Sequence, residues 1–276
     1  MLGKLLKQEF RATGRIMLPV FGALLLLSVL GNVSIRMLNF GLDKSPVLTF
    51  LFMFLIVAFG LGVFATMFMT LWLMITRFYR NLLKEEGYLM HTLPVSVHSL
   101  VWSKLIVSLC WFLAAGLVIF LITGISTLIQ SGTDLARFLQ GFPSWSMVKA
   151  ALAEEGIRMG DLWLMLLEGC VLALVGFFAI CLHFYAAMAM GHMFNKDKVL
   201  LSIVFFVGLS FVMNLFTSMS GVGVVQSLMV QEVETTRVAL ALVHRTLLFG
   251  TLIEAVQATA LYYATTLSLR RGLNLA

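Results

Sequence analysis

Three ionisable side chains lie inside long apolar runs, where they could do chemistry: Glu168 and His183 in one run and Glu254 in another. A charge at the centre of a bilayer costs at least about 2.5–3.5 kcal/mol, so such groups face a cavity or a partner. They could line a translocation path, where they would contact a cationic substrate or carry a proton. Alternatively, each is hydrogen-bonded between helices. Glu254, ten positions after His244, is the better candidate for a buried charge, whereas Glu168 is expected near an interface.

The other reactive residue types lack the spacing that catalysis or metal binding needs. The histidines are scattered without an H-E-x-x-H motif, and the three cysteines lie in apolar runs without ligand spacing. No G-x-x-x-x-G-K-[ST] sequence occurs, so the chain lacks the usual means of holding nucleotide phosphates. We therefore expect no catalytic residue, no metal, no cofactor and no enzymatic activity in this chain.

The composition is that of a membrane protein. Of 276 residues, 61% are hydrophobic and 12% charged, and the mean hydropathy is +1.00. Soluble domains carry roughly 45–50% apolar and about 25% charged residues, so a water-soluble enzyme and a disordered chain are both excluded. The net charge is +6, but the basic residues flank apolar runs, as orientation in a membrane requires. No nucleic-acid partner is therefore expected.

Six segments are apolar and long enough to cross roughly 30 Å of hydrocarbon, which takes about 20 helical residues. The prediction is an all-α integral membrane protein with a single transmembrane domain over residues 1–276. The second segment would be about 45 Å long as a helix, so it must tilt or extend beyond the bilayer. The predicted spans are residues 16–38, 47–76, 100–129, 162–190, 199–219 and 239–269.

The distribution of basic residues predicts the orientation. Twelve of the 19 Lys and Arg residues lie in the N-terminal segment, the second and fourth loops and the C-terminus, and seven lie in the remaining loops. The positive-inside rule therefore puts both termini in the cytoplasm of a multi-pass protein of the cell membrane.

On the outer side, residues 131–161 are expected to form two short helices, Asp134 to Gln140 and Ser144 to Glu155. Their apolar faces would lie on the membrane as a partial lid or simply pack there.

Residues 1–15 are predicted to form an amphipathic helix that lies along the cytoplasmic membrane surface before the first span. As a helix, this segment carries basic and apolar side chains on separate stripes, an arrangement suited to an anionic leaflet. The alternative is an ordinary basic flank that only sets topology. The membrane-surface residues would be Lys4, Lys7, Arg11 and Arg15.

The loop between the second and third spans differs sharply from its neighbours. Gly87, after two glutamates, is suited to the end of the helix that leaves the second span. Residues 88–93 are expected to form a short amphipathic turn that Pro94 ends, and Ser96 can cap the helix of the third span. Exposed apolar surface of this kind usually has a partner. The alternative is a loop that packs on its own helices.

The run Glu85-Glu86-Gly87-Tyr88-Leu89, followed by Thr92-Leu93-Pro94-Val95-Ser96, resembles the coupling segment of bacterial ABC exporter permeases of the type-2 family. The layout of a basic N-terminal helix, six spans and two inner termini is also similar. The resemblance implies that residues 85–96 dock a short helix onto a separate ATPase subunit, which binds ATP and Mg. The docking residues would be Glu85, Glu86, Gly87, Tyr88, Leu89, His91, Thr92, Leu93 and Pro94.

A dimer with a second permease copy or a paralogue is expected, because six helices rarely enclose a path alone. Membrane lipids would surround it. The alternative is a proton-coupled secondary transporter that uses Glu254, Glu168 or His183, although such carriers tend to show an internal repeat and none is visible. The apolar composition is compatible with peptide, lipid or drug as the substrate and does not choose among them.

Overall fold

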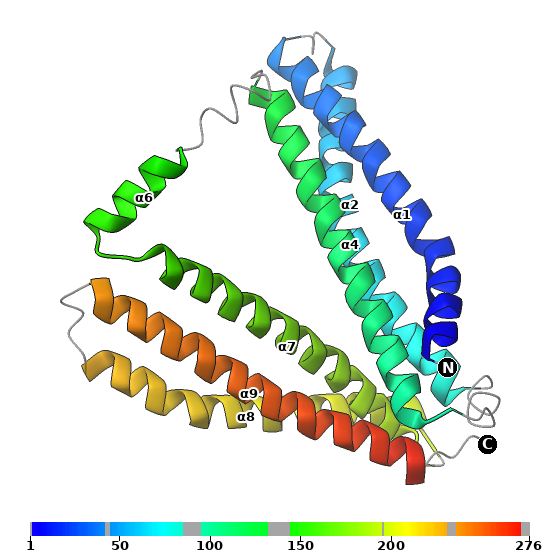
Figure 1. The fold of residues 1–276 in the computed structure, drawn as a ribbon. Helices are drawn as coiled ribbons and strands as arrows, with labels where there is room; N and C mark the ends of the chain where they lie inside the picture. Colours follow the sequence, from blue (N-terminus) through cyan, green and yellow to red (C-terminus); the bar gives the residue numbers. More distant parts are fainter. Residues whose placement is uncertain are drawn as a thin grey trace. The chain divides into compact units, whose positions relative to one another are not determined.

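The computed structural model describes residues 2–41, 45–84, 95–131, 144–194, 196–230 and 236–271. These residues are helical and contain no strand (Figure 1), so the all-α prediction is confirmed for this part of the chain. The elements are α1 (Leu2–Asn39), α2 (Pro46–Phe78), the π-helix η1 (Tyr79–Leu83), α4 (Val97–Ser131), α6 (Trp145–Glu154), α7 (Met159–Gly191), α8 (Lys198–Val230) and α9 (Thr236–Arg271).

Six helices in this part of the chain are long and apolar enough to cross a membrane. Each overlaps one of the six predicted spans. The segment Pro46–Leu83, which joins α2 to η1, has 38 residues and would be about 57 Å long if straight. It therefore exceeds the roughly 40–45 Å of a bilayer with its headgroups. The six apolar segments are Leu2–Asn39, Pro46–Leu83, Val97–Leu128, Met159–Gly191, Lys198–Met219 and Arg237–Arg270.

The N-terminal region differs from the sequence prediction in one respect. Residues 2–39 form one helix, with Pro19 inside it, so no break separates residues 1–15 from the span predicted at 16–38. The physical reason is that this first part of α1 packs on α4. Leu5 and Glu9 are buried there, and the Phe10 ring lies 6.2 Å from the Trp111 ring. An orientation of residues 1–15 along the membrane surface stays a prediction.

The chain divides into two compact units. Unit 1 comprises Met1–Arg77 and Trp102–Phe142, and unit 2 comprises Phe78–Val101 and Pro143–Ala276. Unit 1 thus holds α1, almost all of α2 and α4 from Trp102 onward. Unit 2 holds η1, the first turn of α4, and α6 to α9. That both units form a single transmembrane domain stays a prediction.

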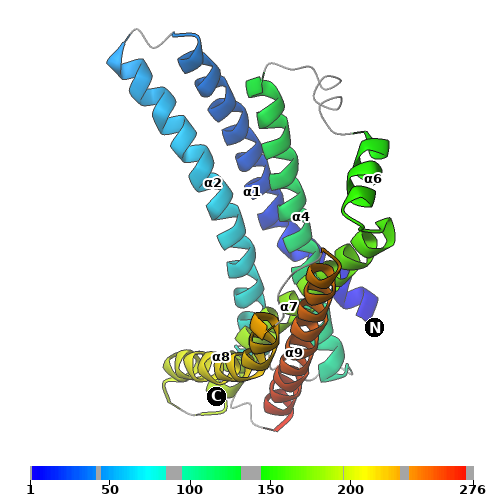
Figure 2. The same cartoon turned by 90° about the vertical axis from the view of Figure 1, so that its left-hand side faces the viewer.

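In unit 1, α1, α2 and α4 run side by side (Figures 1 and 2). A small core of Met17, Phe21, Leu73 and Ala115 joins all three helices. Helices α1 and α2 approach closely at Gly31, where an added Cβ would lie 3.1 Å from the Cβ of Phe59. Small residues at such crossings let the backbones approach, which is the usual device of helices packed in membranes.

In unit 2, α7 packs along both α8 and α9. Helices α7 and α9 run in the same direction, because both begin at the same end of the unit, and α8 runs the opposite way (Figure 1). Helix α6 is the second of the two short helices predicted between residues 131 and 161. The first, Asp134 to Gln140, lies outside the described residues.

Helices α7 and α8 meet most closely at Gly191. A Cβ at this position would lie 2.5 Å from the backbone nitrogen of Ser202, far inside contact distance. Only glycine therefore fits at this crossing, and Ser202 itself is buried. The contact fixes the turn between α7 and α8.

Candidate functional site

The predicted docking residues lie between η1 and α4, and all of them fall outside the described residues. They are Glu85, Glu86, Gly87, Tyr88, Leu89, His91, Thr92, Leu93 and Pro94. The residues on either side of this segment, 78–84 and 95–101, are described. Both flanks belong to unit 2, together with α7 and α9. The contacts of the two flanks therefore show which helices residues 85–94 are connected to.

The first flank is fixed to the C-terminal half of α7 by two pairs of rings. Phe78 and Tyr185 are both fully buried, and their rings stack 4.0 Å apart with an interplanar angle of 7°. The next residue, Tyr79, meets His192 edge to face at 5.2 Å between ring centroids. Aromatic pairs of this kind contribute about 0.5–1.5 kcal/mol beyond burial of their area. Phe78 and Tyr79 therefore anchor this flank on α7.

At this flank the hydrogen-bonding pattern of the backbone changes from that of an α-helix to that of a π-helix. Lys84 N–H donates to the carbonyl oxygen of Tyr79 at 3.1 Å, which is the i to i+5 spacing of a π-helix. Asn81, Leu82 and Leu83 are buried in the same turn. Single π-helical turns are found mostly within α-helices and frequently at functional sites. Here the wider turn brings Phe78 and Tyr79 onto α7.

The second flank is fixed to α9 through His98. The Ser96 hydroxyl accepts from Ser99 N–H at 3.3 Å, which confirms the predicted N-cap of α4. His98 Nδ1 lies 2.5 Å from Tyr262 Oη, and its Nε2 lies 2.6 Å from Arg270 Nη2. A guanidinium can only donate, so Nε2 accepts and Nδ1–H donates to the tyrosine.

The carboxylate of Glu168 forms a pair that sequence spacing did not reveal. Its Oε2 lies 2.7 Å from His244 Nδ1, so α7 and α9 are joined across 76 positions. Glu168 is 9% exposed, whereas Glu254 is half-buried. Glu168, and not Glu254, is therefore the more buried carboxylate within the protein. Only the parallel packing of α7 and α9 brings His244 to this position.

His183 and Glu254 differ in their partners. His183 Nε2 lies 2.9 Å from Ser210 Oγ and 3.2 Å from the carbonyl oxygen of Phe206, both on α8. This is the hydrogen-bonded arrangement between helices that the sequence left open as an alternative. Among the described residues, no hydrogen bond or ion pair reaches the Glu254 carboxylate. A role of Glu168, His183 or Glu254 in a translocation path stays a prediction.

The basic N-terminal stripe is exposed. The face of α1 opposite to it contains Leu5, Glu9 and Thr13, all buried. Glu9 forms an ion pair with Lys104 of α4, and Thr13 Oγ1 accepts from Trp111 Nε1 at 2.7 Å. No signal in the sequence marked Lys104 as the partner of Glu9. The exposed stripe residues are Lys4, Lys7, Arg11 and Arg15.

No group of three or more metal-ligating side chains occurs in the part of the chain that the structure describes. No family model, curated protein or solved structure matches this chain. The class that the fold defines is a helical multi-pass membrane protein with six candidate spans.

Proposed function

We propose that the chain is the permease subunit of an ATP-binding cassette exporter. It forms the translocation path with a second copy or a paralogue, and a separate ATPase subunit supplies the energy by binding ATP and Mg. Residues 85–96 dock on that subunit. The observation that carries the proposal is the attachment of both flanks of this segment to α7 and α9, through Phe78 and His98.

The attachment supports coupling for a mechanical reason. A push that reaches the start of this segment would pass into α7, because the preceding ring stack is fully buried against α7. The following residues hold α9 through two hydrogen bonds at His98. Helices α7 and α9 pack along each other, so both would move as one body. A loop that merely joined two spans would need neither contact.

The charge distribution supports the proposed orientation. With both termini in the cytoplasm, the exposed stripe of Lys4, Lys7, Arg11 and Arg15 faces the anionic inner leaflet of the cell membrane. Residues 85–96 then lie on the same side as the ATPase subunit. The opposite orientation would put this segment where ATP is absent.

The first test is capture of the partner. Affinity-purified protein is expected to bring down an ATPase subunit from its own cells. Leu89→Asp and Leu93→Asp should lose that subunit, because a charge replaces an apolar anchor at the interface. Leu139→Asp makes the same chemical change in the segment proposed for the outer side and should retain it. Retention of the ATPase by both docking variants would remove the assignment of residues 85–96.

A second variant separates docking from transmission. Tyr262→Phe removes only the hydroxyl that contacts His98, so the ATPase should still co-purify. Hydrolysis of ATP in the purified complex should then respond less to the permease than in the native complex. An unchanged response would mean that the His98 contact does not transmit movement.

A proton-coupled secondary transporter is the second candidate, and the buried pair of Glu168 and His244 favours it. A carboxylate and an imidazole at 2.7 Å between two candidate spans can share a proton. The two functions differ in their energy source. Transport that a protonophore abolishes and that ATP depletion leaves intact would favour the carrier, and the reverse would favour the exporter.

A further inference from the structure

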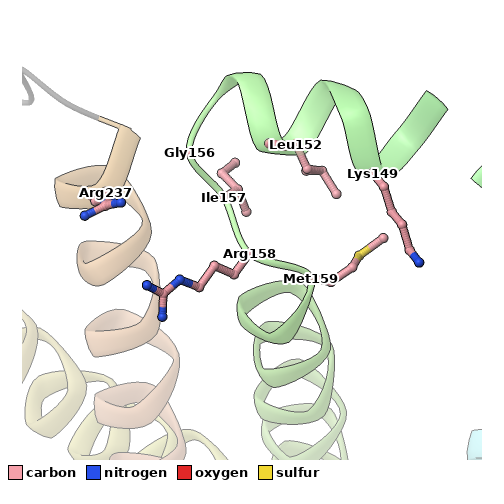
Figure 3. A pocket seen from close by; sticks show the side chains of 8 residues that line it. Lys149, Leu152, Gly156, Ile157, Arg158, Met159 and Arg237 are labelled. Carbon is pink, nitrogen blue, oxygen red and sulfur yellow. The ribbon is translucent and has the colours of Figure 1, made fainter. Parts of the chain in front are cut away.

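A pocket of about 470 Å³ lies in unit 2 where α6, the start of α7 and the start of α9 meet (Figure 3). Its volume falls in the range of about 300–1,000 Å³ that small-molecule sites occupy. Basic and apolar side chains line it together. The basic ones are Lys149, Arg158 and Arg237, and the larger apolar ones are Leu152, Ile157 and Met159.

The turn between α6 and α7 builds one wall of the pocket. Ile157 N–H donates to the carbonyl oxygen of Leu152 at 2.8 Å, and Gly156 N–H donates to that of Ala153 at 3.1 Å. This pair of bonds is a Schellman motif, in which Gly156 takes the left-handed conformation with φ of 71°. Arg158 N–H then donates to Asp161 Oδ2 at 3.1 Å and starts α7. The wall is therefore a defined hydrogen-bonded turn.

The pocket lies at the boundary of the apolar spans. Met159 and Arg237 line it, and they are the first residues of two candidate spans. Trp145 on α6 and Trp163 on α7, which lie four positions from the lining residues Lys149 and Met159, are 55% and 59% exposed. Exposed tryptophans gather at membrane–water interfaces, where the ring is apolar and its N–H is wet. These features are typical of a site at the depth of the lipid headgroups.

The residues that line the pocket carry a net positive charge. No carboxylate lines the pocket, and no ion pair to its three basic residues occurs among the described residues. In Figure 3 the guanidinium of Arg158 is directed towards α9, which carries Arg237, while Lys149 lies on α6. The parallel helices α7 and α9 both begin at this end, so the positive ends of both dipoles add to the charge. The carboxylate of Asp161, at the start of α7, accepts a hydrogen bond from the backbone N–H of Arg158.

We propose that this pocket binds an anionic phospholipid of the bilayer. The phosphate and the rest of the charged headgroup contact Lys149, Arg158 and Arg237. The glycerol and the first acyl carbons pack on Leu152, Ile157 and Met159. A free phosphate would contact only the basic side chains. A lipid at headgroup depth contacts the basic side chains with its headgroup and the apolar side chains with its glycerol and acyl carbons. This inference does not depend on the energy source of transport.

The test uses the full chain, purified in a non-ionic detergent and titrated with defined lipids by native mass spectrometry. Phosphatidylglycerol should bind at least tenfold more tightly than phosphatidylcholine, which carries the same phosphate but no net charge. Each lost cation should weaken phosphatidylglycerol about fivefold. The triple variant Lys149→Gln, Arg158→Gln, Arg237→Gln should therefore bind phosphatidylglycerol no better than phosphatidylcholine. Glycerol 1-phosphate, the soluble headgroup alone, should bind far more weakly.

Two exposed arginines on α9 supply the matched control. Arg237 lines the pocket and Arg245, eight positions later, does not. Arg237→Gln should lose about fivefold in phosphatidylglycerol affinity, while Arg245→Gln should stay within twofold of the unmodified protein. Equal losses in both variants, equal binding of both lipids, or equal binding of glycerol 1-phosphate would each overturn the proposal. The single variants keep the test decisive if the triple variant does not fold.

Discussion

In unit 1, the described polar contacts between α1 and α4 involve no histidine, whereas in unit 2 several polar contacts between helices do, beside the bond of Gln257 Nε2 to Thr217 Oγ1 at 2.7 Å. The buried ion pair of Glu9 with Lys104 and the bond of Asn32 Nδ2 to Ser126 Oγ at 2.7 Å join α1 to α4. The sequence of unit 1 holds no histidine, and unit 2 holds all five, including every described one. Each described histidine contacts a second element of unit 2: His98, His183, His192 and His244.

This difference has a consequence for movement. Histidine is the side chain whose charge changes between pH 5 and 8, and its hydrogen bonds change with it. The histidine contacts that join α4 and α7 to α9, α7 to α8, and η1 to the end of α7 can therefore be altered by one proton or one displaced donor. The contacts of unit 1 cannot be remade in this way. If the chain is a transporter as proposed, unit 2 is the part that we expect to rearrange.

The largest expected effect comes from breaking the ion pair of unit 1. Lys104→Met leaves the Glu9 carboxylate buried without its partner, and removing one member of a buried pair costs about 3–5 kcal/mol. We expect a large drop in thermal stability in detergent at neutral pH. The double variant Glu9→Gln, Lys104→Met should recover most of it. A single variant as stable as the double variant would show that the Glu9 and Lys104 pair does not hold α1 to α4.

A smaller effect is expected where α7 crosses α8. Gly191→Ala forces a methyl group against the Ser202 backbone, and overpacking of this kind costs about 1–3 kcal/mol. Gly176, on the same helix, has no atom within 4 Å of an added Cβ. Gly176→Ala should therefore leave the melting temperature unchanged or raise it slightly. Equal melting temperatures for the two variants would show that the crossing tolerates a wider separation.

The six apolar helices could be predicted because the bilayer itself sets their length and composition. The helix of the second span continues through η1 to Leu83, beyond the predicted Thr76, because Leu82 and Leu83 pack inside unit 2. The predicted separation at residue 15 of α1 is absent. Composition changes at that point, but Glu9 finds Lys104 on α4 and the helix stays continuous. The local sequence pattern around residue 15 cannot predict a contact with a residue as distant in the chain as Lys104.

The candidate site was predictable only in its residue types. Glu168 and His183 were singled out because ionisable groups are rare in apolar runs. The partner of Glu168 could not be found, because His244 is 76 positions away and becomes a neighbour only through the packing of α7 on α9. The contacts of His98 with Tyr262 and Arg270 are hidden for the same reason. The docking function of residues 85–96 stays a prediction.

The smallest expected effect is a pH dependence at His192, which follows the last residue of α7. Burial, the largest cause, lowers the pKa of His192; the nearby charge of Lys198 lowers it too, and the bond to the Met188 carbonyl opposes them. The unfolded chain, with a usual pKa near 6.5, then takes up the proton at a higher pH than the folded protein. The stabilising effect of the neutral ring is complete above that value and falls as the pH decreases below it.

We therefore expect the melting temperature of the purified protein to fall between pH 7.5 and pH 5.5, and to fall less in His192→Gln. The difference between the two proteins isolates His192 from the other histidines of unit 2. Because the His192 ring meets Tyr79, its protonation also loosens the first flank of residues 85–94 from α7. Limited proteolysis between η1 and α4 should accordingly become faster at low pH in the unmodified protein and less so in the variant. Identical pH profiles for both proteins would mean that the contrast between the units does not extend to this contact.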